Sequence, residues 1–311
     1  PSGARRFLDH WRPGLAVLVE SELWPGLLLQ AKASGTRLAL LGARLSERSA
    51  KGWAGAPRSA RAVLGAFDLI LAQDGLSRRR IEALGGRVAG ELDLKKAGTP
   101  LECDEDELRR LKSTVGNRPV LVAASTHPGE DEAATDALAA MAPPRPLLIV
   151  VPRHPQRGGA IAEMLAGRGL RVARRSQGQA LDEQIQVYVA DTLGELGLFF
   201  RLADLGSMGG SLTGGVGGHN PMEPARLGLA VVSGPDTVNF REAYAGLLSA
   251  QGAVTACDQA ALNRLVADLI ADPALRREMG LRAQAYAEAD NQALDSALQA
   301  LRPLLPGASS S

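Results

Sequence analysis

Cysteine and histidine are scarce in this sequence and lack the spacing that a metal or redox site requires. The 311 residues include two cysteines, which lie far apart and fit no metal-binding or redox motif. This usage is typical of a reducing compartment. The four histidines lie in separate segments, at His10, His127, His154 and His219, without an HExxH pair. We therefore expect no metal site.

Long apolar runs and the commonest phosphate-binding motif are missing as well. No stretch approaches the ~20 apolar residues that cross a membrane, and no signal peptide opens the chain. The motif GxxxxGK[ST] does not occur, which argues against a P-loop enzyme. Only 4% of the residues are aromatic, whereas 45% are hydrophobic, so we expect a large core of Ala, Leu and Val. Because the sequence begins at Pro1 without a methionine, we expect the natural start to lie upstream.

The charges are unevenly spread, although the net charge is only +1. Lys and Arg outnumber Asp and Glu in residues 1–98, and the balance reverses in residues 99–311. A basic front half indicates an anionic partner, for which a phosphorylated lipid, a membrane surface and nucleic acid all qualify. Arginines scattered over a solvated surface would give the same balance.

Apolar strand-like runs alternate with amphipathic helical stretches over most of the chain. Continuous apolar strands between helices are typical of a parallel sheet covered on both faces. A polar, acidic segment near residue 100 divides the runs into two series, 15–20, 37–42, 68–73 and 86–92, then 118–125, 145–152, 170–175, 185–190, 203–209 and 229–234. We predict an α/β fold with two doubly wound, Rossmann-like domains facing a cleft, the first of them truncated because its series is short.

Ligands bind such folds beyond the carboxyl ends of the strands, where unusual segments of the second series lie. In STHPGEDE, Ser125 and Glu130 suit the start of a helix, and capping alone would explain them. In VPRHPQR, Arg153 stands between two prolines that fix its backbone. A guanidinium held there could grip a phosphate through two parallel hydrogen bonds, unless the segment is only a surface turn.

The stretch GGVGGHNPMEPARLG, residues 214–228, is the most distinctive of these segments. Its glycines allow backbone N–H groups to approach a ligand, and the positive end of the helix that follows favours phosphate or carboxylate. Glu223 is placed to accept hydrogen bonds from ribose hydroxyls. A flexible turn before a helix is the alternative interpretation, because a glycine-rich loop by itself is weak evidence.

Two segments of the front half also carry polar side chains next to predicted strands. In VESELWPG, Glu20 and Glu22 end a strand just before the helix that Pro25 opens, where a carboxylate could orient an acceptor hydroxyl or only cap the helix. The segment ARLSERSAKGW could cradle a phosphorylated substrate or form a solvated loop. Its candidate residues are Arg44, Ser46, Arg48 and Lys51.

Seven segments in this order resemble the Kdo transferases of lipopolysaccharide synthesis. They are ESELWPGL, ARLSERSAKGW, STHPGEDE, VPRHPQR, DTLGELGLFFRLADL, GGSL…GGHNPMEPARLG and GPDTVNFREAY. The resemblance implies a GT-B fold and the transfer of 3-deoxy-D-manno-octulosonic acid (Kdo) from CMP-Kdo to a lipid A precursor, with inversion and without a metal or cofactor. It also implies a peripheral position on the cytoplasmic face of the bacterial inner membrane, for a chain that is itself soluble and binds no nucleic acid.

The resemblance also assigns domains and residues. It implies a partial acceptor domain at 1–98, a linker at 99–117, a CMP-sugar-binding domain at 118–280, and a helix returning to the first domain within 281–311, followed by a frayed tail. Glu22 matches the acidic residue that stabilises the transition state. The CMP-binding positions are Pro152, Arg153, Leu193, Gly194, Glu195, Asn220, Pro221, Met222 and Glu223. Further donor-site candidates in the same segments are Ser125, His127, Gly210, Ser211 and His219.

The sequence departs from the family pattern at two places. The family's general base, a glutamate in a Ser-Val-Gly-Glu motif, would precede Pro1, so we expect the 311-residue chain alone to be inactive. The family's catalytic lysine position holds Asp93, and neither Lys95 nor Lys96 nearby is assigned its role. A nucleotide-sugar epimerase of the same architecture and a non-catalytic nucleotide-sugar-binding module are the alternatives. The segments SELWP and RLSERSAKG argue against the epimerase, whereas Asp93 favours the binding module.

Overall fold

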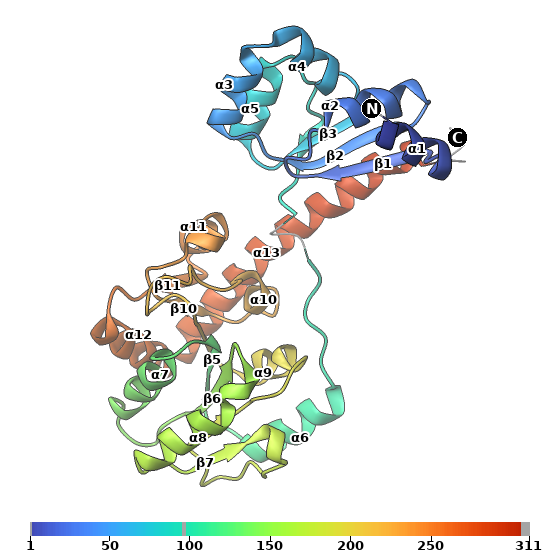
Figure 1. Ribbon diagram of the computed structural model, residues 1–311. Coiled ribbons are helices and arrows are strands. Elements are labelled where there is room, and N and C mark those ends of the chain that lie inside the picture. Colours follow the sequence, from blue (N-terminus) through green and yellow to red (C-terminus); the bar gives the residue numbers. More distant parts are fainter. Residues whose placement is uncertain (1, 95–97, 306–311) are drawn as a thin grey trace. The chain divides into compact units, whose positions relative to one another are not determined.

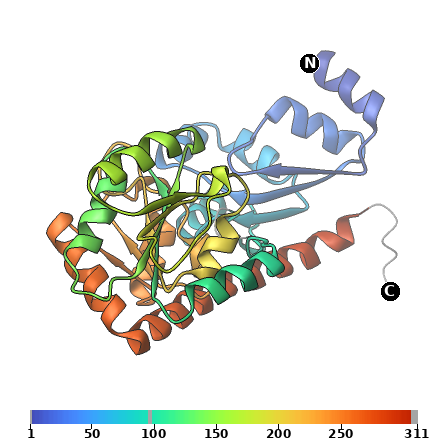
Figure 2. The same ribbon diagram turned by 90° about the horizontal axis from the view of Figure 1, so that it is seen from below.

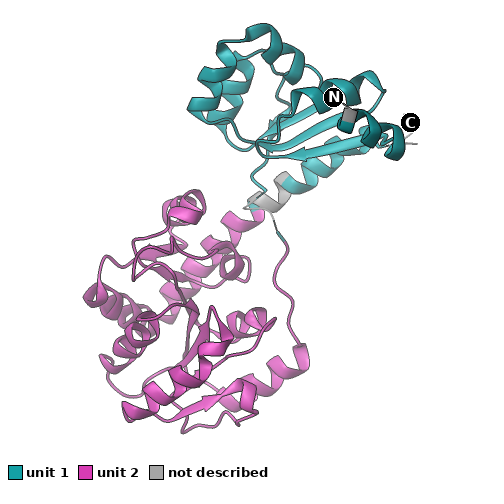
Figure 3. Ribbon diagram, in the orientation of Figure 1, with its two compact units in different colours: residues 1–98, 289–311 teal, residues 99–288 magenta. Residues whose placement is uncertain are grey.

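The computed structural model describes residues 2–94 and 98–305. It divides into two compact units (Figure 3): unit 1 contains residues 1–98 and 289–311, and unit 2 contains residues 99–288. Each unit is built on one sheet of parallel strands with helices between them, so the predicted α/β fold with two parallel-sheet domains is confirmed. No helix in the described part of the chain is long and apolar enough to cross a membrane.

Unit 1 contains a four-stranded parallel sheet in the order β1-β2-β3-β4 (Figure 1). The strands are β1 (Leu15–Val19), β2 (Arg37–Ala43), β3 (Leu69–Ala72) and β4 (Gly90–Glu91). The helices are α1 (Ser2–Trp11), α2 (Pro25–Ala33), α3 (Glu47–Ala54), α4 (Pro57–Leu64) and α5 (Gly75–Ala83), and η4 (Arg302–Leu304) is a short 3₁₀ helix. Pro25 and Pro57 open α2 and α4, where a missing N–H costs nothing.

Both faces of the unit 1 sheet are covered, because neighbouring residues of β2 point to opposite sides. Leu38 packs with Leu28 of α2 on one face. Ala39 packs on the other face with Ala297, near the end of α13 (Pro273–Leu301). The continuous apolar run of β2 is therefore the signature of a strand buried on both sides.

Unit 2 contains a seven-stranded parallel sheet in the order β11-β10-β9-β5-β6-β8-β7. The strands are β5 (Val120–Thr126), β6 (Leu147–Pro152), β7 (Val172–Arg174), β8 (Val187–Val189), β9 (Leu205–Met208), β10 (Val231–Ser233) and β11 (Ala253–Thr255). The helices are α6 (Glu105–Val115), α7 (Glu130–Ala139), α8 (Gly158–Gly167), α9 (Leu196–Leu202), α10 (Met222–Ala225), α11 (Arg241–Ser249), α12 (Gln259–Ala271) and the first part of α13. Short 3₁₀ helices are η1 (Pro155–Arg157), η2 (Arg175–Gln177) and η3 (Val238–Phe240).

Helices cover the unit 2 sheet (Figure 2), and core residues lie on both of its faces, with β5 fourth of the seven strands. Val120, Val122 and Ala124 face the core that includes α6 and α9, whereas Leu121 and Ala123 face the core that includes α7 and α12. Because both faces are apolar, the strand is buried along almost its whole length. Its carboxyl end leads directly into the loop that begins at His127.

Three features differ from the expectation: the linker, one additional strand and the boundary near residue 280. The segment 99–117, expected as a linker, contains α6, whose Leu108 and Leu111 are buried in the unit 2 core. Strand β11 was not expected, since it has only three residues, and one of them is exposed. The expected boundary between 280 and 281 falls inside α13, and the two units divide between Glu288 and Ala289 instead.

Candidate functional site

Most of the predicted donor-site residues lie in four loops at the carboxyl ends of β5, β6, β8 and β9 in unit 2 (Figure 1). Because these four strands are parallel and adjacent in the order β9-β5-β6-β8, their following loops meet at one edge of the sheet. The residues brought to this edge include Ser125, His127, Arg153, Leu193, Gly194, Glu195, Gly210, Ser211, His219, Asn220 and Glu223.

The carboxylate of Glu130, at the start of α7, anchors the glycine-rich loop. Glu130 is 2% exposed. It accepts hydrogen bonds from the backbone N–H groups of Gly210 (2.7 Å), Ser211 (3.0 Å) and Leu212 (3.0 Å). It also accepts one from the N–H of His127 (3.0 Å), in the preceding loop. The backbone N–H groups of the donor-site candidates Gly210, Ser211 and His127 are therefore engaged by the protein itself.

The second part of the glycine-rich loop is held by the segment after β10. The Asp236 carboxylate accepts from the N–H groups of Gly215 (2.9 Å) and Gly217 (3.2 Å). The Asn239 amide donates to the carbonyl of Val216 at 2.6 Å. Gly217 has a φ of +89°, and an added Cβ would lie 2.7 Å from the Asn239 side chain, so the close approach requires glycine. GPDTVNF therefore supports the loop, a role that the sequence analysis did not assign.

Two histidines from different loops meet beside this anchor. The Nε2 atoms of His127 and His219 lie 2.8 Å apart, and the ring planes are within 7° of each other. His154 approaches His127 edge-on, with 6.1 Å between ring centroids. Burial lowers the pKa of both His127 and His219. The lowered pKa favours the neutral form of both rings.

Arg153 follows directly after β6 and presents the cation of the site. Its backbone N–H donates to the carbonyl of Thr126 at 3.1 Å, which fixes the backbone beside β5. The side chain is exposed, and within the described residues its guanidinium makes no hydrogen bond or ion pair. Its charge acts on His127, His219 and Glu223, which places all three near it. An anion that enters this edge therefore meets a positive charge that forms no ion pair within the described part of the chain.

Arg157, only four residues further on, has a different role. It forms an ion pair with Asp131, whose side chain is fully buried, and donates to the carbonyl of Thr126 at 3.0 Å. Thr126 in turn donates to Asp131 at 2.5 Å. These contacts tie the loop after β6 to the loop after β5. The sequence did not distinguish the two arginines.

Within the segment Asn220–Glu223, only the first and last side chains offer polar atoms. Asn220 accepts from the N–H of Met222 at 3.0 Å, and its amide donates to Glu223 at 3.4 Å. Pro221 and Met222 are buried and serve packing. Burial raises the pKa of Glu223. The predicted helix is α10, which begins within this segment at Met222 and has only four residues.

The loop after β8 is pinned by two consecutive arginines. Arg174 donates to Asp191 through Nε (3.1 Å) and Nη2 (2.7 Å). Arg175 grips both oxygens of Glu195 and also pairs with Glu107 of α6. Hydrogen bonding from Arg175 lowers the pKa of Glu195.

Between Asp191 and Glu195, which the two arginines hold, the loop is exposed to solvent at Leu193 and Gly194. Leu193 is 81% exposed, and Gly194 has a φ of +82°. The two arginines were not among the sequence candidates, because they stand in an ordinary basic stretch 17 and 20 residues from their partners.

The predicted acceptor-side residues lie together at the carboxyl edge of the unit 1 sheet. The Ser21 hydroxyl donates to the carbonyl of Arg44 at 2.9 Å, which joins the loops after β1 and β2. Glu22 is exposed and accepts a 2.5 Å hydrogen bond from the indole N–H of Trp24. Ser46 caps α3 by accepting from the N–H of Ser49. Lys51 pairs with Glu47 at 2.7 Å.

Arg44 and Arg48 are the exposed arginines of this group. Asp93 lies close by, in a small recess lined by Glu20, Gly42, Gln73, Asp93 and Leu94. Lys95 and Lys96 are outside the described residues.

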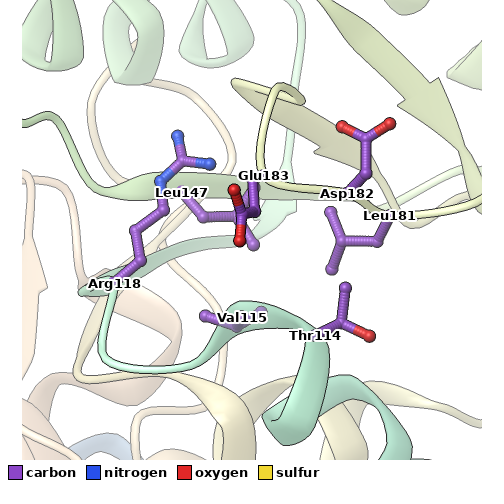
Figure 4. A pocket seen from close by; sticks show the side chains of 7 residues that line it. All are labelled: Thr114, Val115, Arg118, Leu147, Leu181, Asp182 and Glu183. Carbon is purple, nitrogen blue, oxygen red and sulfur yellow. The ribbon is translucent and has the colours of Figure 1, made fainter.

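A cavity of about 210 Å³ lies elsewhere in unit 2 (Figure 4). Its lining includes Leu147, the first residue of β6, so it lies toward the amino ends of the strands and away from the four loops. Arg118, which borders it, donates to the carbonyls of Arg145, Pro146 and Ile185. This arginine therefore holds the backbone together. Among the described residues, no group of three or more His, Cys, Asp or Glu could hold a metal ion.

Comparisons with known proteins connect these features to one family. The family profile described as "3-Deoxy-D-manno-octulosonic-acid transferase (kdotransferase)" matches residues 1–95. The 3-deoxy-D-manno-octulosonic acid transferase of Bordetella pertussis is 36% identical over 98% of this chain and 72% of its own length.

Solved structures resemble the chain as well. The C-terminal CMP-Kdo binding domain of WaaA from Acinetobacter baumannii is 31% identical with a TM-score of 0.54, and the match covers 58% of this chain and 96% of that one. A UDP-N-acetylglucosamine 2-epimerase has a TM-score of 0.53 over 99% of this chain and 78% of its own, but it is only 13% identical. That likeness concerns the fold alone.

Proposed function

The chain belongs to the 3-deoxy-D-manno-octulosonic acid transferase family, and on that premise we propose that it moves Kdo from CMP-Kdo to a hydroxyl of a phosphorylated lipid A precursor. We place donor binding in unit 2. The observation that carries this assignment is Arg153, whose guanidinium has no partner among the described residues and lies near Glu223 at the carboxyl edge of the sheet. The likeness to a domain named for CMP-Kdo binding supports it.

In this proposal Arg153 binds the phosphate of CMP, and Glu223 with Asn220 binds the ribose hydroxyls. The loop of Leu193 and Gly194 borders the nucleotide. A general base takes the proton of the acceptor hydroxyl as its oxygen attacks the anomeric carbon of Kdo, and the bond from that carbon to the phosphate oxygen breaks, so the configuration inverts. The electron pair of the broken bond leaves with CMP, and Arg153 stabilises the charge that develops there. A divalent metal is then not required for this task.

Unit 1 supplies the acceptor side of the proposed reaction. The carboxylate of Glu22 stabilises positive charge at the anomeric centre as the donor bond breaks. The exposed guanidinium groups of Arg44 and Arg48 attract the phosphates of the lipid, at a peripheral position on the cytoplasmic face of the inner membrane. The uneven charge of the chain supports this arrangement, because Lys and Arg are concentrated in residues 1–98.

Isothermal calorimetry with CMP tests the donor assignment. Replacement Arg153→Ala should weaken CMP binding by about 1.5–3 kcal/mol, since it removes a charge-assisted contact without disturbing another side chain. Arg277→Ala, at an exposed arginine of α13, is the matched control and should leave the affinity unchanged. Equal CMP affinity in the Arg153→Ala protein and the wild type would remove Arg153 from the site. EDTA should not abolish binding.

A further inference from the structure

The paired imidazoles of His127 and His219 have a protonation state fixed by their geometry. Their Nε2 atoms are 2.8 Å apart in nearly parallel rings, so one nitrogen donates a hydrogen and the other accepts it. The two rings belong to the loop after β5 and the glycine-rich loop after β9. In the neutral state one Nδ1 atom therefore carries a hydrogen and the other does not.

Such a pair can gain one proton without losing its hydrogen bond. The proton goes to the Nδ1 atom of the donor ring, which becomes an imidazolium that still donates through Nε2. Both Nδ1 atoms are then N–H donors, and the pair carries a single positive charge. A second proton would need the lone pair that now accepts the shared hydrogen, so it would break the contact between the loops.

The surroundings keep the pair neutral when no ligand is bound. The groups whose charge acts on the two rings are Glu130, Arg153, His154 and Arg157. Glu130 is the one carboxylate among them, and its oxygens already accept four backbone N–H groups. From α11, the hydroxyl of Tyr244 donates to the carbonyl of His219 at 3.0 Å and adds no charge at neutral pH. Burial also opposes protonation, because it lowers the pKa of both rings.

The geometry points to a histidine pair that takes up one proton when the phosphodiester of the donor binds beside Arg153, so that donor affinity depends on pH. This inference rests on the proposed donor site. A bound anion offsets the cations that face the rings and favours the protonated pair. By linkage, a ligand that raises a pKa binds more tightly as the pH falls through the raised pKa toward the pKa of the free protein.

Calorimetric titration with the methyl ester of CMP tests the inference. This probe is a phosphodiester and has no phosphate proton to exchange near neutral pH, whereas CMP itself has a phosphate pKa near 6. Titrations between about pH 5.5 and 8, each in two buffers of different ionisation enthalpy, measure the protons taken up. Between the pKa of the free pair and the higher pKa of the bound pair, we expect uptake of up to one proton and an affinity that falls by up to about tenfold per pH unit as the pH rises; above the pKa of the bound pair the affinity should level off.

Two substitutions assign the proton to the pair. His127→Gln and His219→Gln should each bind the probe with an affinity that varies little with pH and without proton uptake. His10→Gln, in α1 of unit 1, is the matched control and should behave as the wild type. If either glutamine variant fails to fold, the imidazole NMR titration of the wild-type protein with and without probe still reports whether the pKa of the pair rises on binding.

The possible outcomes separate the two proposals. Probe binding with no proton uptake and no change in the imidazole pKa would overturn the role of the pair while leaving the donor site in place. Proton uptake that persists unchanged in both glutamine variants would also overturn it, because the proton would then belong to another group. Absence of probe binding at every pH would contradict the donor site itself, and with it the inference.

Discussion

The anchoring of the glycine-rich loop by Glu130 gives a prediction whose size follows from the contacts. The carboxylate accepts four backbone N–H groups at 2.7–3.0 Å and is almost fully buried. In Glu130→Gln, one side-chain oxygen becomes an NH₂ group that faces two of these N–H donors. Hydrogen bonds to charged groups contribute about 1.5–3 kcal/mol each, but they are not additive, so we expect a loss of about 2–4 kcal/mol. Glu163→Gln, at an exposed position of α8, should change stability by less than about 0.5 kcal/mol.

The distribution of aromatic residues makes the assay specific to each unit. The three tryptophans, Trp11, Trp24 and Trp53, all lie in unit 1, whereas the three tyrosines lie in unit 2. In urea unfolding of Glu130→Gln, tyrosine near-ultraviolet dichroism should therefore shift to lower midpoint, while tryptophan fluorescence keeps the wild-type transition. An unchanged tyrosine transition would refute the anchoring argument. A shift of both signals by the same amount would show that the two units unfold together.

Two further predictions concern contacts near the loop after β8 and near Glu22. Arg110 and Arg175 lower the pKa of Glu107 to about 2, and Arg175 lowers the pKa of Glu195. The free energy that these two carboxylates contribute to folding is therefore complete above their unfolded pKa near 4.5. It is lost as the pH falls through their lowered pKa values, which for Glu107 means toward pH 2. In Arg175→Met, the free energy of unfolding measured in urea should therefore fall less steeply as the pH is lowered. A pH profile identical to that of the wild type would contradict the role of Arg175 in holding Glu107 and Glu195. Trp24→Phe keeps an aromatic ring but removes the indole N–H that donates to Glu22, so in a chain extended upstream of Pro1 to include the general base, kcat for Kdo transfer should fall about three- to tenfold with an unchanged KM for donor. A change confined to KM would show that Trp24 acts in binding.

The strands were predictable because strands buried on both faces have continuous apolar sequences. The run at 145–152 contains the observed strand β6, and the run at 118–125 covers all of β5 except its last residue, Thr126. In contrast, α6 was hidden by its acidic first turn, which looks like a solvated linker. Its signals were the cap Asp104 and the apolar pair Leu108 and Leu111. The boundary between the two units inside α13 could not be placed, because no proline or glycine interrupts the helical pattern between 281 and 301.

The site was predictable as a set of segments but not as a set of contacts. In the sequence STHPGEDE, Glu130 and Asp131 are equally suited to the first turn of a helix. In the structure, Glu130 accepts hydrogen bonds from a loop 80 residues away, whereas Asp131 forms an ion pair with Arg157. The sequence VPRHPQR likewise contains two equivalent arginines, and only the turn of η1 directs Arg157 inward and leaves Arg153 exposed. Such assignments depend on contacts between distant segments, about which local propensity contains no information.

The contacts around Arg153 explain how an exposed cation can act as the centre of an anion site. Free carboxylates nearby would compete with the ligand for the guanidinium, because a phosphate must then displace an existing ion pair. Here Asp131 is paired with Arg157, and Asp191 with Arg174. Glu130 is satisfied by backbone N–H groups. These carboxylates have their partners before any ligand arrives, so the site needs little reorganisation when negative charge develops on the leaving nucleotide. A fixed charge lowers an activation barrier most when no such reorganisation is needed.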